Sequence, residues 1–136
     1  MKNLLVTTAL LEAVTGVALM VSPAPPVMLL VGAALDTTAG LLVARVAGAA
    51  LLALGVACWA ARDDGESHAA RGIVAAMLLY NTAAVAVLVY AGLGLKLFAI
   101  SLWPAVALHL ALAFWCVVGL RGTKAQPVSD SMRNQR

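Results

Sequence analysis

The sequence predicts an all-α fold: an integral membrane four-helix bundle, with a short interfacial or re-entrant segment between helices 1 and 2. Of its 136 residues, 63% are hydrophobic and 11% are charged, whereas a soluble domain carries about 25% charged residues. The mean hydropathy is +0.98, so much of the surface must face lipid. Alanine, valine, leucine and glycine dominate and aromatic residues are few, which favours helices packed through small residues over a β-barrel.

The first predicted span covers residues 3–21, long enough to cross a hydrocarbon layer of about 30 Å. Glu12 interrupts this run, which argues against a cleaved signal peptide because the apolar region of such a peptide is uncharged. The proline-rich residues 22–26 end the span, since proline removes a backbone donor and fixes φ. Residues 27–35 are apolar but too short to cross, and they are expected to lie at the interface or to re-enter.

The second predicted span covers residues 37–61 and begins at a helix N-cap pattern, Asp36-Thr37-Thr38. The elements that follow are a charged turn, the third span, a glycine-rich connection, the fourth span and a flexible polar tail: 62–68, 70–91, 92–96, 97–120 and 122–136. Pro104 lies near the start of the fourth span, where proline costs least. The four spans form one predicted transmembrane domain, residues 1–121.

Basic residues predict the orientation, because they are enriched on the cytoplasmic side of a membrane protein. One side of the predicted bundle collects Lys2, Arg62, Arg71, Arg121, Lys124, Arg133 and Arg136. The other side collects Lys96. Both termini are therefore expected in the cytoplasm. Two aromatic pairs then lie near the two interfaces, as in an aromatic belt: Trp59 with Trp115, and Tyr90 with Trp103.

Small residues recur at four-residue spacing along two of the spans, which lets helix backbones approach closely. These rows are Gly40, Ala44 and Gly48, then Ala49, Ala53, Ala57 and Ala61, and in the third span Gly72, Ala76, Tyr80 and Ala84. The second span has two such faces and is expected to be central in the bundle.

Polar side chains occur at depth in all four spans: Glu12, Arg45, Tyr80, Asn81 and His109. At 1.5 Å per residue, Glu12, Asn81 and His109 fall roughly 13–17 Å from the inner boundary. Arg45 falls at roughly 24 Å by the same count, although its long side chain can reach further down. These residues are therefore expected to form a polar core, either for ligand binding or for structure.

A charge at the bilayer centre costs about 2.5–3.5 kcal/mol, so charged residues there are expected to face inward and pair. Our hypothesis is a Glu12–Arg45 ion pair with Asn81 and His109 as hydrogen-bonding neighbours. The functional interpretation is a ligand pocket or proton site. The structural interpretation is a device that fixes helix register. In a third interpretation Arg45 reaches the outer surface toward Asp36.

No catalytic or metal-ligating pattern is recognisable in the sequence. His68 lies in the cytoplasmic turn and cannot face His109, so a haem held by both histidines is not expected within one chain, whereas one held across a dimer stays open. Cys58 and Cys116 have no metal-site spacing and are expected to be packed thiols. The cofactor is therefore left unassigned.

The first helix resembles that of the small multidrug resistance transporters, in Leu11-Glu12-Ala13-Val14-Thr15-Gly16 and Ala18-Leu19-Met20. Those proteins have four short helices and a membrane-embedded glutamate that exchanges protons for cationic drugs, and Glu12 would correspond to it. The resemblance covers about one helix. The third span lacks the tryptophan-bearing stretch of that family, and Arg45 would place a positive charge near the site.

The layout of the whole chain resembles the DoxX-like small bacterial membrane proteins. The shared features are a first helix, a proline-rich break, a short apolar segment with Gly32, then Ala44-Arg45-Val46-Ala47-Gly48-Ala49 and Leu54-Gly55. Arg45 and Gly48 match the arginine–glycine element of the second helix in that family. The resemblance implies a multi-pass protein of the bacterial cytoplasmic membrane, and it implies little about activity.

Three functions are compatible with these observations. The first is a membrane protein, with no enzymatic activity, that binds or carries a small ligand at the polar core. The second is an accessory or assembly subunit that packs against another membrane protein. The third, an enzyme acting on a lipid or a quinone, lacks the usual paired carboxylates, nucleophile or metal ligands. The expected partners are membrane lipids, a small-molecule ligand, and a second copy of the chain or another membrane protein. Nucleic acid is not expected, because no basic stripe is present.

Overall fold

The computed structural model describes residues 1–65 and 67–122. Its elements, in order, are α1 (Lys2–Val21), α2 (Ala24–Val31), α3 (Thr38–Ala60), the 3₁₀ turn η1 (Ala61–Asp63), α4 (His68–Val89), the π-helical turn η2 (Tyr90–Gly94) and α5 (Leu102–Arg121). The fold is all-α, with four long apolar helices and the short α2 between α1 and α3, as predicted. The predicted tail lies outside the described residues except for Gly122.

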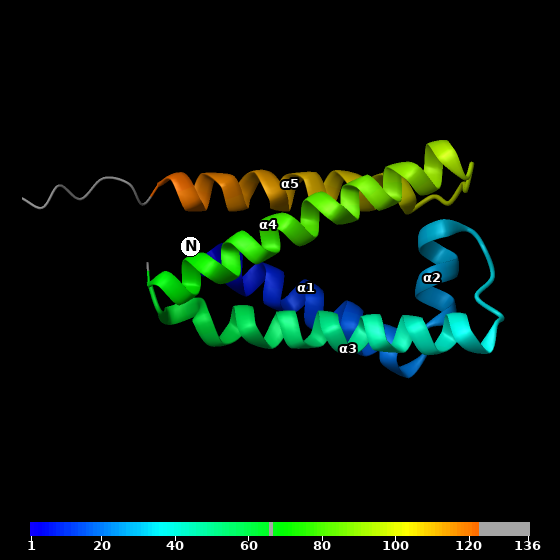
Figure 1. The fold of residues 1–136 in the computed structure, drawn as a ribbon, viewed down its shortest axis with the longest axis horizontal. Coiled ribbons are helices and arrows are strands. Elements are labelled where there is room, and N and C mark those ends of the chain that lie inside the picture. The colour runs from blue at the N-terminus through cyan, green and yellow to red at the C-terminus, as the bar shows by residue number, and fades with distance from the viewer. Residues whose placement is uncertain (66, 123–136) are drawn as a thin grey trace, which may run out of the picture.

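The long helices are arranged as two pairs, with α1 packed along α3 and α4 packed along α5 (Figure 1). The prediction that the second span is central is therefore wrong, because α3 has its main contacts with α1 and few with α4. Only some residues of the predicted small-residue rows are buried between helices. Gly48 is buried, whereas Ala49 and Ala53 on the other face are exposed, as are Gly72 and Ala76 on α4.

Glycines set the close approach of α1 and α3. A Cβ atom added at Gly48 would lie 2.7 Å from the Gly16 carbonyl oxygen and 2.9 Å from the Met20 backbone nitrogen. A Cβ atom added at Gly16 would lie 2.7 Å from the Gly48 carbonyl oxygen. Further along, one at Gly55 would lie 3.0 Å from the Ala9 carbonyl oxygen. The two backbones are thus in direct contact, the arrangement that small residues allow in membrane helices.

The predicted short apolar segment forms α2, which begins inside the proline-rich run. Pro25 and Pro26 lie in its first turn, where backbone donors have no helical partner and proline is tolerated. Gly32 ends the helix with φ 72°, a left-handed conformation that favours glycine. In Figure 1, α2 runs across the direction of the long helices. This orientation favours the interfacial interpretation of the segment over the re-entrant one.

The start of α3 agrees with the prediction, whereas the start of α5 does not. Thr37 caps α3 as predicted, and its hydroxyl accepts a hydrogen bond from the Gly40 backbone at 3.1 Å. The predicted fourth span began at residue 97, but α5 begins at Leu102. A helix starting at 97 would place Pro104 beyond its first turn, where the missing donor and the ring are costly. The chain instead turns at Lys96, which has φ 53°.

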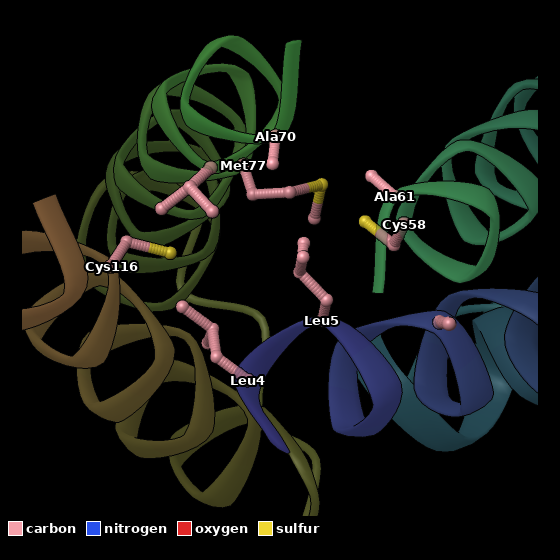
Figure 2. Packing of buried hydrophobic residues seen from close by; sticks show 9 residues of the cluster. Leu4, Leu5, Cys58, Ala61, Ala70, Met77 and Cys116 are labelled. Atoms are coloured by element: carbon pink, nitrogen blue, oxygen red, sulfur yellow. The ribbon is translucent and has the colours of Figure 1, made fainter. Parts of the chain in front are cut away.

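All four long helices meet at the end of the bundle that holds the N-terminus. Figure 2 shows their buried side chains pointing into a shared interior, which we call the N-terminal cluster. Its buried members are Leu4, Leu5, Ala9, Cys58, Ala61, Ala70, Val74, Met77 and Cys116. Both cysteines are free and buried there.

A second apolar cluster, the α2-end cluster, lies near the other end of α4 and α5. Its buried members are Leu88, Ala91, Leu102 and Val106, and Leu30 and Val31 of α2 pack against it. The Ser101 hydroxyl also donates a hydrogen bond to the Leu29 carbonyl. Thus α2 is attached to the pair formed by α4 and α5, although it follows α1 in sequence.

Four helical segments are long and apolar enough to cross a membrane. They cover Lys2–Val21, Thr38–Asp63, His68–Gly94 and Leu102–Arg121. Their mean hydropathies are 1.8 to 2.2, yet only 22–33% of the residues in each apolar window are buried inside the fold. Large apolar side chains are therefore exposed along every long helix, a surface that suits lipid and not water.

Candidate functional site: a polar layer between two apolar clusters

Glu12 and Thr8 are buried on one face of α1, one helical turn apart. The Glu12 side chain is 4% exposed and Thr8 is 1% exposed. Residues four apart on a helix are neighbours on its surface, so both point toward the space between the two helix pairs. The structure thus buries a carboxyl group within a candidate membrane span.

Tyr80, Asn81 and His109 form one connected group on α4 and α5. The His109 Nδ1 atom lies 2.8 Å from the Asn81 Oδ1 atom. Asn81, 0% exposed, also donates through Nδ2 to the Met77 carbonyl at 2.7 Å. The Tyr80 and His109 rings meet edge to face, with centroids 5.7 Å apart and planes at 79°. Because the amide oxygen of Asn81 accepts, His109 presents its Nδ1–H to it.

The Tyr80 hydroxyl connects this group to α1 by donating a hydrogen bond to the Glu12 carboxyl group. Glu12, Tyr80, Asn81 and His109 together form what we call the polar layer. On α4, Asn81 lies between Met77 of the N-terminal cluster and Leu88 of the α2-end cluster. The polar layer therefore separates two apolar clusters about half-way along the bundle.

A small cavity of about 90 Å³ adjoins the polar layer. Its lining combines three groups able to form hydrogen bonds, Glu12, Tyr80 and His109, with Leu11, Thr15, Leu108 and Leu112. A carboxyl group accepts, a phenol does both, and an imidazole donates from one nitrogen and accepts at the other. The cavity can therefore hold water, or a small molecule that has a hydroxyl or a carbonyl group.

Arg45 does not join the polar layer. It is exposed on α3, and the expected Glu12–Arg45 ion pair is not formed. The contact between α1 and α3 is made at Gly48 and Gly55, and Arg45 stays exposed outside this contact. The interpretation in which Arg45 reaches the surface agrees better with this exposure, although it makes no ion pair with Asp36.

Two threonines belong to this region and were not predicted. Thr8 is buried next to Glu12, and Thr15 lines the cavity. Thr8 and Thr15 are four and three residues from Glu12, a spacing that places all three on one face of a helix. This spacing can be recognised in the sequence. Among the described residues, no three His, Cys, Asp or Glu side chains gather closely enough to hold a metal ion.

Comparisons with protein-family models, with curated proteins and with solved structures find no match to this chain.

Proposed function

We propose that the chain is a multi-pass membrane protein that binds a small ligand at the polar layer. Its membrane location is supported by four helices of sufficient length and hydropathy and by their exposed apolar surfaces. Trp59 and Trp115 are exposed near one end of the bundle, and Tyr90 and Trp103 near the other, as aromatic residues at two interfaces would be.

The proposed orientation has the N-terminus in the cytoplasm, and within the described residues the basic side chains support it. Lys2 and Arg62 lie together at the N-terminal end, where each contacts Asp63, at 2.7 Å and 3.2 Å. Lys96 lies at the opposite end. By its layout the chain would be a DoxX-like protein of the bacterial cytoplasmic membrane.

The single observation that supports ligand binding is the cavity against Glu12, Tyr80 and His109. A polar group inside a membrane is costly and marks a functional site more often than not. The structure leaves these three groups facing open space instead of filling it with apolar side chains. A dry packed core would serve equally well if the layer only fixed helix register.

The size of the cavity limits the ligand. Its 90 Å³ compare with about 30 Å³ for one water molecule in the liquid. Pockets for drug-sized ligands measure about 300–1,000 Å³. The cavity therefore accepts a very small molecule, a few water molecules, or the polar end of a longer molecule. Among the described residues, Glu12 is the one carboxyl group that lines the cavity, so the paired acid and base of many hydrolytic enzymes is not found in that part of the chain.

Glu12→Gln is expected to remove the ligand without unfolding the bundle, because glutamine keeps the size of the side chain but replaces the carboxyl group with an amide, which presents different hydrogen-bonding groups to the ligand. The measurement is native mass spectrometry of the protein extracted gently from its own membrane. Thr82→Val serves as control, since Thr82 is exposed on the same helix as Tyr80 and bonds to its own helix at 2.8 Å. A stoichiometric small molecule should accompany wild type and Thr82→Val and be missing from Glu12→Gln. The same bound molecule on all three would refute the assignment to Glu12.

A second candidate is an accessory subunit that packs against another membrane protein. The observation in its favour is the open face of α4, where Gly72 has no neighbouring heavy atom within 4 Å of an added Cβ. Such faces allow close helix packing between chains. In this case a second protein, and no small molecule, would accompany the chain in the mass spectrum. That protein would be lost on Gly72→Leu and retained on Glu12→Gln.

A further inference from the structure

We infer that the ligand of the polar layer enters sideways, from the lipid, through an opening between α1 and α5. The inference rests on the proposed function and specifies its ligand class: an amphipathic, membrane-dissolved molecule with a small uncharged polar head. It begins from the cavity lining. Thr15 of α1 and Leu108 of α5 both line the cavity and are both exposed on the outer surface. The cavity therefore meets the surface between these two helices.

The opening lies within the candidate spans and not at their ends. Thr15 is six residues before the end of α1 at Val21, and Leu108 is six residues after the start of α5 at Leu102. At 1.5 Å per residue, each is about 9 Å along the helix axis from the α2 end. In a bilayer this depth belongs to the hydrocarbon.

Apolar packing lies on both sides of the polar layer along the bundle axis. Toward the N-terminus, the cluster of Leu5, Met77 and their neighbours fills the space between the four helices (Figure 2). Toward the other end, α2 packs against Leu102 and Val106. Charged or strongly hydrated molecules from either aqueous side would have to cross these layers, whereas the sideways opening needs no such step.

The chemistry of the opening defines the ligand. A charged head passing Thr15 and Leu108 would cross hydrocarbon, which strongly disfavours charge. An uncharged hydroxyl or carbonyl head would cross more easily and then bond to Glu12, Tyr80 or His109. With about 90 Å³ available, the head enters the cavity and the apolar body stays outside, against exposed Leu108 and the surrounding lipid.

The test compares two carbodiimides on the full chain in lipid vesicles, one membrane-soluble (dicyclohexylcarbodiimide) and one water-soluble and cationic. Either reagent adds to a protonated carboxyl group: the acid oxygen bonds to the central carbon and the proton moves to nitrogen. The O-acylisourea then rearranges to a stable N-acylurea, and no atom leaves. The adduct on Glu12 is located by peptide mass spectrometry. We expect the membrane-soluble reagent to modify Glu12 and the water-soluble one to leave it unmodified.

Blocking the opening should abolish the modification. Thr15→Trp and the milder Leu108→Phe are expected to lose the adduct, whereas Val14→Trp should keep it, because Val14 is exposed but does not line the cavity. Dodecanol in the vesicles should slow the reaction, and glycerol in the buffer should not. Modification by the water-soluble reagent at a similar rate would overturn the inference. So would an unmodified Glu12 with both reagents, or equal rates in Thr15→Trp, Leu108→Phe and Val14→Trp.

This experiment tests sideways entry of the ligand separately from ligand binding. If the water-soluble reagent reaches Glu12 but native mass spectrometry still shows a ligand that depends on Glu12, ligand binding stands and sideways entry fails. If the membrane-soluble reagent alone reacts but no ligand accompanies the protein, the opening is real and the proposed function fails.

Discussion

Gly48→Ala is expected to destabilise the bundle by about 1–3 kcal/mol, the usual cost of overpacking. The new methyl group would lie 2.7 Å from the Gly16 carbonyl oxygen and 2.9 Å from the Met20 nitrogen. Both are backbone atoms, so α1 and α3 must move apart as rigid bodies. Gly48→Leu should prevent the pair from forming. The measurement is helix content during titration of the protein from mild detergent into SDS.

Gly72→Ala is the matched control for this prediction. An added Cβ there meets nothing within 4 Å, so the change should be neutral or stabilise by up to about 1 kcal/mol through the unfolded state. Equal losses for Gly48→Ala and Gly72→Ala would contradict the prediction, because alanine is a better helix former than glycine and a loss at Gly72 would show that contact between α1 and α3 does not determine the effect.

His109→Leu is expected to cost about 1–3 kcal/mol, because it leaves the Asn81 amide oxygen buried without its partner. Asn81 is 0% exposed, and its contact with His109 is 2.8 Å. The double variant Asn81→Leu/His109→Leu removes donor and acceptor together and should cost less than the sum of the single changes. A coupling of about 0.6–1.7 kcal/mol is expected for a hydrogen bond between membrane helices.

Thr82→Val is the control for the cycle, since Thr82 is exposed and bonds within its own helix. Its effect should stay within about 0.5 kcal/mol. Strictly additive losses for Asn81 and His109 would show that the two side chains do not interact, and the polar layer would then lose its connection between α4 and α5.

Features that depend on local sequence were predictable. The proline-rich break, the Thr37 cap and the four apolar runs each follow from the chemistry of a few adjacent residues. Counting residues along each span also placed Glu12, Asn81 and His109 at similar depths. The structure brings these three into one layer, because α1 and α4 begin, and α5 ends, at the N-terminal end of the bundle, and each residue lies at a similar distance from that end.

Features that depend on helix rotation and pairing were not predictable from one sequence. Arg45 lies nearer the outer end than the polar residues, within reach of them only through its long side chain, and depth does not say which way a side chain points. Its direction is set by Gly48 and Gly55, which α3 turns toward α1. For the same reason, two faces of small residues predict a central position for the second span. The sequence does not show which of the two faces contacts another helix.

The central claim is that Glu12, Tyr80 and His109 share one depth near the middle of a bilayer. Spin labels on the exposed neighbours Val14, Leu79 and Leu110 measure this most directly, as single cysteines in lipid vesicles with Cys58 and Cys116 replaced by alanine. Labels at Val21 and Ala69, near the two ends of the bundle, provide the reference.

The account predicts that dissolved oxygen reaches the three central labels best and that a water-soluble nickel chelate reaches them least, with the opposite order at the two reference labels. If the nickel chelate reached any central label as readily as it reaches the label at Val21, the proposed depth would be wrong. That part of the layer would then lie in water and not in the membrane.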